Sequence, residues 1–213
     1  MAIKWLFFDV GSTLVNEQKA YEHRIQDMIE GTDITYERFC ETMMGYYYRN
    51  LKGDLETARQ FGLKVTPWHS EDEETYPDAE ACLRELRKQY HIGVIANQKL
   101  GTASRLEMFG LLQYIDLVIS SAEEGVSKPD PRIFQLALER AECHSEEAVM
   151  IGDRLDNDVV PAKRLGMKTV WIRQGFGGLS DPALSPEQPD WIVKDLRELV
   201  KLLLKNTEKD EMI

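Results

Sequence analysis

The chain has little of what marks a secreted, membrane-bound or nucleic-acid-binding protein. Only three of its 213 residues are cysteines, widely spaced and odd in number, which indicates reduced thiols rather than disulfides or a zinc site. No apolar run reaches the roughly 18 residues of a membrane span, and no secretory signal pattern opens the chain. Its 26 basic residues face 37 acidic ones, and a net charge of −11 argues against a phosphate-backbone partner. We therefore expect a cytoplasmic protein that binds neither nucleic acid nor membrane.

Short apolar runs alternate with amphipathic segments along most of the chain. A composition of 43% hydrophobic and 30% charged residues is that of an ordinary globular protein with a full core. The expected strands are residues 3–8, 92–96, 117–120, 148–151, 169–172 and 191–193. The expected helices between and after them are residues 78–89, 131–141, 159–165 and 195–204. This alternation predicts an α/β fold of three layers, a doubly wound parallel sheet with helices on both faces.

One region departs from this alternation. Residues 16–77 contain no convincing strand, and three helical patterns follow one another at 17–30, 35–49 and 54–60. Gly31 and Gly62 follow the first and third, as expected of helix ends. The sequence therefore predicts a small α-helical cap, residues 16–77, inserted into a core formed by residues 1–15 and 78–213.

Polar residues follow the expected strands where each ends, the edge at which parallel sheets bind ligands. They are Asp9 with Gly11, Ser12 and Thr13, then Asn97, Lys128, and finally Asp153, Asp156 and Asp158. Each alone has an ordinary structural explanation, as a helix cap, a turn or a solvated charge. Several carboxylates at one edge, however, repel one another unless a cation balances them, and such oxygen ligands suit Mg²⁺. A lysine and a turn of backbone N–H groups beside the metal would bind an anion.

These stretches resemble the haloacid dehalogenase-like hydrolases, in order and over nearly the whole chain. The first family motif is similar to "FFDVGSTL" at residues 7–14, the second to "VIAN" at 94–97 and the third to "GVSKPDP" at 125–131. The fourth is similar to "IGDRLDNDV" at 151–159, and "AKRLGMKTVWI" at 162–172 follows in the family manner. The resemblance implies a Rossmann-like core, a helical cap after the first motif and a reaction through an aspartyl-phosphate.

The resemblance also implies a role for each matching residue. Asp9 would be the nucleophile and Lys128 its catalytic partner, while Asp9, the Gly11 carbonyl and Asp153 would hold Mg²⁺. Asp158 would lie behind them, holding Lys128 or a metal-bound water. The phosphate-binding residues implied are Gly11, Ser12, Thr13, Asn97 and Lys128. The substrate would be a small phosphorylated metabolite.

Two positions depart from the family pattern. Phosphatases of the family usually carry a second aspartate two residues after the nucleophile, where this chain has Gly11. The second motif usually ends in Ser or Thr, where this chain has Ala96. Losing the acid/base group costs about 10²–10⁴-fold in rate. We therefore expect phosphoryl hydrolysis that is weak or dependent on the leaving group.

Three alternatives follow from the same departures. In the first alternative, the chain is a phosphate-sensing or partner-binding module that does not catalyse hydrolysis efficiently. A phosphonatase-like hydrolase would use a lysine of the cap, for which Lys19, Lys52 and Lys64 are the candidates. A true dehalogenase would carry a bulky residue in place of Gly11 and need no Mg²⁺, which fits this sequence less well.

The remaining candidates have weaker patterns. In "MMGYYYRN", Tyr46, Tyr47 and Arg49 either close over a substrate or pack the core of the cap, and helical spacing favours packing. The glycine-rich loop at 173–178 either flanks the site or is a flexible connection, and a connection is the favoured interpretation. The four histidines share no spacing that indicates a metal site or a triad; they are His23, His69, His91 and His144.

Overall fold

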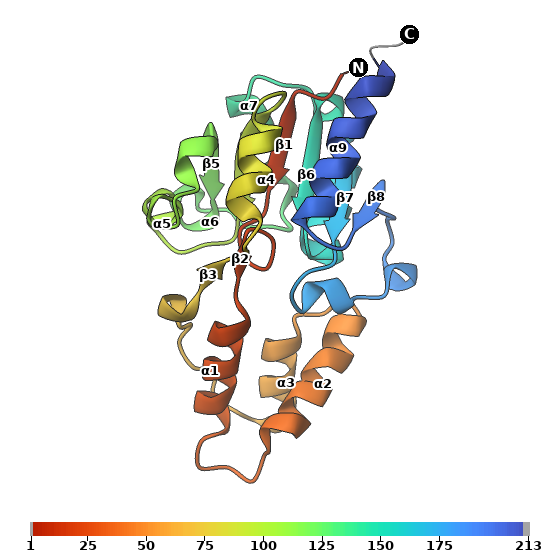
Figure 1. Cartoon of the computed structure of the whole chain (residues 1–213). Coiled ribbons are helices and arrows are strands. Elements are labelled where there is room, and N and C mark those ends of the chain that lie inside the picture. Colours follow the sequence, from red (N-terminus) through yellow and green to blue (C-terminus); the bar gives the residue numbers. More distant parts are fainter. Residues whose placement is uncertain (1, 211–213) are drawn as a thin grey trace.

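The computed structural model describes residues 2–210, and these contain the predicted parallel sheet (Figure 1). Its six strands have the order β5-β4-β1-β6-β7-β8, and every neighbouring pair is parallel. The strands are β1 (Trp5–Phe8), β4 (His91–Ala96), β5 (Leu117–Ser120), β6 (Ala148–Gly152), β7 (Lys168–Ile172) and β8 (Trp191–Val193). All six lie where the sequence predicts strands, so the predicted α/β class is confirmed.

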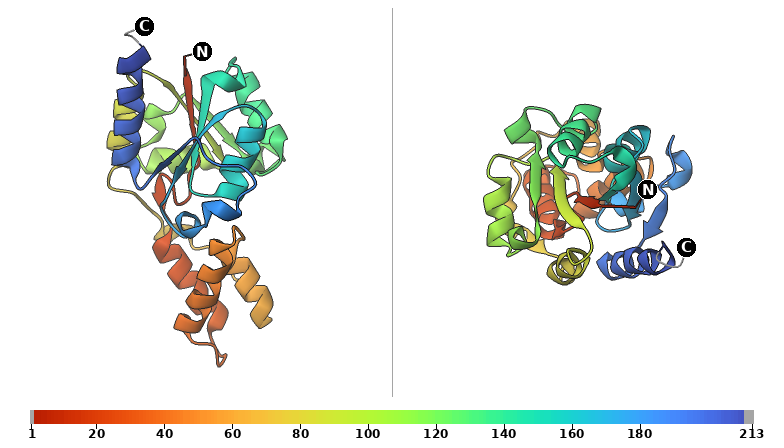
Figure 2. Two further views of the ribbon diagram at one scale, coloured as in Figure 1. Left: turned by 90° about the vertical axis from the view of Figure 1, so that its right-hand side faces the viewer. Right: turned by 90° about the horizontal axis from the view of Figure 1, so that it is seen from above.

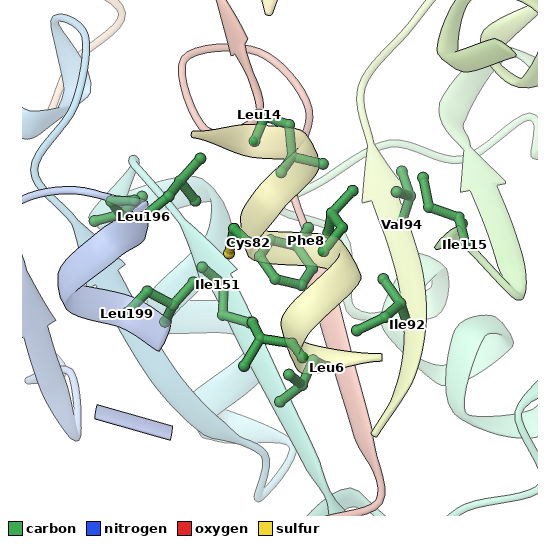
Figure 3. Close-up of a cluster of buried hydrophobic side chains, with 14 of the residues drawn as sticks. Leu6, Phe8, Leu14, Cys82, Ile92, Val94, Ile115, Ile151, Leu196 and Leu199 are labelled. Carbon is green, nitrogen blue, oxygen red and sulfur yellow. The ribbon is translucent and has the colours of Figure 1, made fainter. Parts of the chain in front are cut away.

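The sheet is buried on both faces, as a parallel sheet requires. Successive residues of β1 point to opposite faces: Leu6 and Phe8 join one apolar cluster, and Phe7 joins the other. Figure 3 shows the first cluster, in which Leu196 and Leu199 lie in the same apolar cluster as Phe8 and Ile151 of the sheet. Both β1 and β6 lie in the middle of the sheet, which places the loops after them at its centre.

Helices form the outer two layers (Figure 2). They are α4 (Ala79–Leu86), α5 (Thr102–Met108), α6 (Ser121–Glu124), α7 (Pro131–Arg140), α8 (Val160–Arg164) and α9 (Leu196–Asp210). Buried apolar residues of α4, α5 and α9 belong to the first cluster, and those of α7, with Ala162 of α8, to the second. Asp130 accepts a hydrogen bond from the backbone N–H of Arg132 and so caps the start of α7. The short helices α5 and α6 were not predicted.

The predicted helical insertion lies beyond the carboxyl ends of the strands (Figure 1). It contains α1 (Gln18–Ile29), α2 (Tyr36–Tyr48) and α3 (Gly53–Phe61), which pack around a small apolar cluster of their own. The chain leaves and re-enters the core through two short antiparallel strands, β2 (Val15–Asn16) and β3 (Glu74–Thr75), which the sequence did not indicate. The division of the chain at residues 16 and 77 stays a prediction. No helix within residues 2–210 is long and apolar enough to cross a bilayer.

Candidate active site

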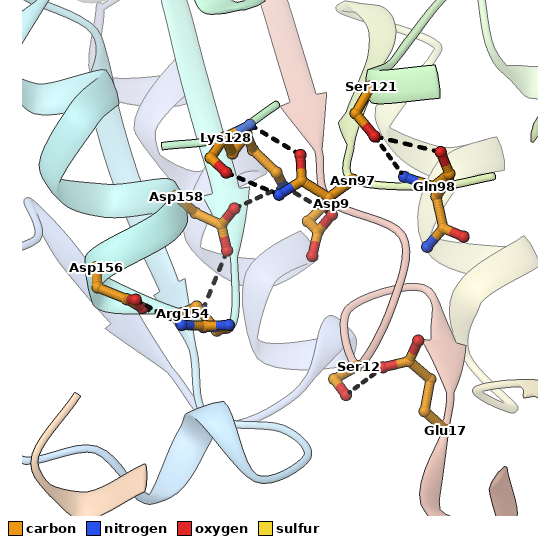
Figure 4. A network of polar contacts seen from close by, with 10 residues as sticks. All are labelled: Asp9, Ser12, Glu17, Asn97, Gln98, Ser121, Lys128, Arg154, Asp156 and Asp158. Carbon is orange, nitrogen blue, oxygen red and sulfur yellow. Dashed lines mark hydrogen bonds and ion pairs between the residues drawn. The ribbon is translucent and has the colours of Figure 1, made fainter. Parts of the chain in front are cut away.

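Three charged side chains from separate segments of the chain meet at the carboxyl edge of the sheet (Figure 4). Nζ of Lys128 donates hydrogen bonds to Oδ1 of Asp9 and to Oδ1 of Asp158, both at 2.7 Å. The side chains of Lys128 and Asp158 are fully buried, whereas that of Asp9 is 13% exposed. Asp9 is therefore within reach of solvent, and its two partners lie buried behind it.

The loop that carries Lys128 is held by Asn97. The side-chain amide of Asn97 donates to the Lys128 carbonyl at 2.8 Å and accepts from the Lys128 N–H at 2.8 Å. Both ends of the amide are therefore engaged by one residue. Asn97 lines the same cavity as Asp9, but its observed contacts position the lysine.

Asp153 lies just after β6, and no counter-charge among the described residues is bound to its carboxylate. No hydrogen bond to a side-chain oxygen of Asp153 is formed within the described part of the chain, although its carbonyl accepts from Trp171 Nε1 at 2.6 Å. The loop at 173–178 comes very close, since a Cβ on Gly177 would lie 2.9 Å from the Asp153 Cγ. This loop therefore flanks the site, which was the less favoured of its two interpretations.

The electrostatics of the site leave negative charge in excess. Burial raises the pKa of Asp153 well above its usual range, and repulsion from Asp158 and Asp9 raises it further. Burial also raises the pKa of Asp158 to about 6, since Lys128 only partly opposes this and Asp9 adds to it. Burial opposes the charge of Lys128, but the two carboxylates outweigh this and raise its pKa. One ammonium therefore faces three carboxyl groups.

The donor atoms fit a magnesium ion. Asp9, Asp153 and Asp158 each offer a carboxylate oxygen within 4.8 Å of the others. Asp158 is already engaged, because it accepts from Lys128 and from the Arg154 N–H at 3.1 Å. Asp9 and Asp153 are the carboxylates left for a cation. Hard oxygen ligands with surplus negative charge are what Mg²⁺ prefers.

Magnesium should stabilise the protein more as the pH rises. Carboxyl groups with raised pKa bind more protons in the folded than in the unfolded state between their ordinary pKa and the raised one. Stability without metal should therefore fall as the pH rises from about 4, the ordinary carboxyl pKa, toward and beyond about 6, the pKa of Asp158 in the folded protein. A bound cation offsets this repulsion, so we expect the Mg²⁺-induced increase in Tm to grow across the same interval. Thermal unfolding with and without Mg²⁺ measures it.

Two asparagine variants make this test specific. Asp153→Asn should lose the Mg²⁺-induced shift in Tm. Asp156→Asn should keep it, because Asp156 lies in the same loop but pairs with Arg154, 3.0 Å from its Nε. A Tm that ignores Mg²⁺ at every pH would contradict the metal site.

A cavity of about 470 Å³ opens above Asp9, between the sheet edge and the insertion. The residues on its core side include Asp9, Gly11, Ser12, Asn97 and Asp153. Those on the side of the insertion include Glu17, Tyr21, Arg24, Tyr47, Lys52, Asp54 and Trp68. Most predicted site residues therefore share one cavity with side chains that the sequence did not single out.

The wall formed by the insertion is a connected polar network. Nη1 of Arg24 donates to Oδ2 of the fully buried Asp54 at 2.8 Å. The hydroxyl of Tyr47 donates to Asp54 Oδ1 at 3.3 Å and lies 3.0 Å from the Tyr21 hydroxyl. The cavity therefore has preformed polar groups facing the metal-binding edge.

Only one of the three predicted cap residues lies in this wall. Tyr47 lines the cavity, whereas Tyr46 donates to Gln60 at 2.7 Å and Arg49 stacks over the Tyr46 ring at 4.7 Å. Tyr46 and Arg49 thus contact each other, Tyr46 also contacts α3, and neither lines the cavity. The packing interpretation fits Tyr47, which belongs to the apolar cluster of the insertion as well as lining the cavity, but not the half-buried Tyr46 or the exposed Arg49.

The turn after β1 brings Glu17 against the predicted phosphate-binding residues. Oγ of Ser12, a residue with φ of 54°, donates to Oε2 of Glu17 at 3.0 Å. Burial raises the pKa of Glu17 to about 8, and repulsion from Glu73 and Asp9 contributes. Thr13 is fully buried behind the cavity wall, and its hydroxyl has no hydrogen-bond partner within the described residues.

Sequence reasoning missed Glu17, Arg24 and Asp54 because they lie on or beside ordinary amphipathic helices. It also missed a pairing of two histidines: the rings of His23 and His69 stack at 3.6 Å, and His69 Nε2 lies 2.7 Å from Asp27. The spacing of these two histidines in the sequence did not indicate that their rings would stack. The pairing ties α1 to the segment that returns to the core.

Comparisons with known proteins agree with this geometry. A family model described as haloacid dehalogenase-like hydrolase matches residues 6–172. The glyceraldehyde 3-phosphate phosphatase of Pyrococcus furiosus is 30% identical over 99% of this chain and 97% of its own length, and that of Pyrococcus abyssi is 33% identical over 81% and 82%. The crystal structure of a HAD phosphatase from Thermococcus onnurineus superimposes with a TM-score of 0.64 at 28% identity, covering 94% of this chain and 98% of that one. The similarity therefore extends over the insertion as well as the sheet.

Proposed function

The chain belongs to the haloacid dehalogenase-like hydrolase family and is a hydrolase of its phosphatase type, and we propose that it hydrolyses a small phosphorylated metabolite through a phosphorylated Asp9, with Mg²⁺ as cofactor. The buried ion-pair cluster supports this best, because Lys128 holds Asp9 at the floor of a cavity beside Asp153, which has no ion-pair partner in the described part of the chain. The names of the relatives indicate a small sugar or triose phosphate. A cavity of about 470 Å³ has room for such a substrate.

Each residue of the site has its own role in the proposed reaction. Lys128 fixes Oδ1 of Asp9, which leaves Oδ2 to attack phosphorus, and its charge stabilises the transferring group. Backbone N–H groups of the turn at Gly11 and Ser12 bind phosphate oxygens. Asp9, the Gly11 carbonyl and Asp153 would hold Mg²⁺, which neutralises charge on the phosphoryl oxygens when bound. Asp158 keeps Lys128 in place.

Proton transfer to the leaving oxygen decides which substrates react. Gly11 offers no carboxyl group, and Ala96 offers no hydroxyl to the phosphate. If position 11 alone determined proton transfer, the enzyme would be slowed by about 10²–10⁴-fold on alkyl phosphates and would favour aryl, acyl or enol phosphates.

A panel of phosphate esters tests the proposed function. We expect phosphate release from at least one small sugar or triose phosphate, glyceraldehyde 3-phosphate among them, and from 4-nitrophenyl phosphate, with EDTA abolishing both. Absence of Mg²⁺-dependent turnover over the whole panel, together with calorimetric binding of phosphate, would favour the phosphate-sensing or partner-binding module instead.

One observation keeps a phosphonatase-like reaction in consideration. Lys52 lines the cavity, whereas Lys19 forms an ion pair with Glu74 at 3.0 Å and is not among the lining residues. An imine-forming lysine would be trapped by borohydride in the presence of an aldehyde substrate. Labelling of wild type but not of Lys52→Ala would support this second function, and absence of labelling would exclude it.

A further inference from the structure

The direction in which a side chain at position 11 would point is occupied by the carboxyl group of Glu17. A Cβ built on Gly11 would lie 2.7 Å from Cδ and 2.7 Å from Oε2 of Glu17, far inside normal contact distance. The backbone at Gly11 does not have a positive φ, so the turn itself does not require glycine there. The absence of a side chain at position 11 leaves room for the carboxyl group of Glu17, six residues further along the chain.

The side chain of Glu17 is held beside Gly11 and does not cap its own helix. Glu17 is the N-cap residue of α1, yet its side chain forms no capping hydrogen bond with that helix. It accepts from Ser12 Oγ at 3.0 Å instead, within the loop that carries Asp9 (Figure 4). No ion pair to Glu17 is formed within the described residues, and Glu17 lines the same cavity as Asp9 and Asp153.

We propose that Glu17 is the acid/base residue of this enzyme, its carboxyl group replacing the one that Gly11 lacks. The inference rests on the proposed phosphatase function and changes its expected substrate range. A carboxyl group beside position 11 faces the leaving group of an ester whose phosphorus lies at Asp9. Alkyl phosphates then become substrates, contrary to the expectation drawn from Gly11 alone.

The proton balance of both steps involves the same group. In the first step an oxygen of Asp9 bonds to phosphorus, the bond from phosphorus to the ester oxygen breaks, and the Glu17 proton moves to that oxygen, which leaves as an alcohol. In the second step the Glu17 carboxylate accepts a proton from water while the water oxygen bonds to phosphorus and the bond to Asp9 breaks. Inorganic phosphate leaves, and both carboxyl groups return to their starting states.

Glu17→Gln tests the proposal, because it keeps the size of the side chain and removes its proton chemistry. With Mg²⁺ present, kcat/KM for an alkyl phosphate should fall by about 10²–10⁴-fold, and that for 4-nitrophenyl phosphate much less. Phosphorylated Asp9 should accumulate in the variant and be visible as an added phosphoryl group in its intact mass. Glu22→Gln is the matched control on the same helix. Glu22 accepts a hydrogen bond from Gln18, and the Glu22→Gln variant should have the wild-type activity on both esters.

A second set of variants asks whether positions 11 and 17 supply the same group. An aspartate at position 11 needs the space of the Glu17 carboxyl, which sits at the end of a flexible side chain and can move. In the Gly11→Asp background, Glu17→Gln should therefore cost little, so the two effects are not additive. A crystal structure of metal-free Gly11→Asp should show the Glu17 carboxyl displaced from its place beside residue 11.

The outcomes separate this inference from the proposed function. Glu17→Gln with the wild-type rate on alkyl phosphate and no phosphoenzyme would overturn the role of Glu17 and leave the phosphatase in place. A wild-type protein inactive on both esters would contradict the proposed function itself, and the inference would fall with it. If Gly11→Asp alone then became active, the scaffold would be competent and Glu17 shown not to replace the missing group.

Discussion

Asp9→Asn should abolish turnover while leaving the fold intact. The amide cannot form the phosphorylated intermediate, so we expect kcat to fall by at least about 10³-fold on every ester. The Lys128–Asp158 pair does not depend on Asp9 and should persist. Because the site holds more carboxyl groups than ammonium groups, removing one negative charge should not lower the Tm of the metal-free protein. Steady-state kinetics and thermal unfolding measure the two effects.

The same variant identifies the phosphorylated residue. Asp9→Asn should show no added phosphoryl group in its intact mass, even when combined with Glu17→Gln, the change expected to trap the intermediate. Asp156→Asn should retain activity, because that side chain pairs with Arg154 and not with the cluster. Retention of a tenth or more of the wild-type rate in Asp9→Asn would show that another group attacks phosphorus.

The fold could be predicted from the sequence because its pattern is local. Each buried strand is a short apolar run, and Asp130 followed by proline marks a helix start that the structure has. The two-residue strands β2 and β3 were missed because so short a pair has no periodicity. Helices α5 and α6 were missed for the same reason, since one or two turns show no clear apolar face.

The site could be predicted only as far as its residues follow strands. Asp9, Lys128 and Asp153 lie at the one edge where parallel strands end, so topology brings them together from far apart in sequence. Glu17 could not be found in this way, because its position depends on the angle at which α1 leaves the core. A glutamate at the start of a helix is also an ordinary residue there. The absence of a side chain at Gly11 was visible in the sequence, but the group that fills its space was not.

Lys128→Met should both inactivate and destabilise the enzyme. The fully buried ammonium lies between Asp9 and Asp158, and its removal leaves a buried carboxylate, Asp158, without a partner. Breaking a buried pair in this way costs about 3–5 kcal/mol, which lowers the Tm of a chain of this size by roughly 6–20 °C. Lys163→Met is the matched control: Lys163 pairs with Asp190 at 2.8 Å but is 30% exposed, so its loss should cost at most about 1 kcal/mol.

The pH dependence of that loss separates charge from packing. The pKa of Asp158 is about 6 even with Lys128 present, so without the lysine the carboxyl group should hold its proton to higher pH. The deficit in stability should then be largest near pH 8 and shrink as the pH falls toward 5, because the protonated acid needs no counter-charge. Adding Asp158→Asn to Lys128→Met should restore most of the Tm at pH 8 but none of the activity, because the charge beside Asp9 is still missing. A deficit of equal size at both pH values would mean that Lys128 stabilises the loop by packing alone.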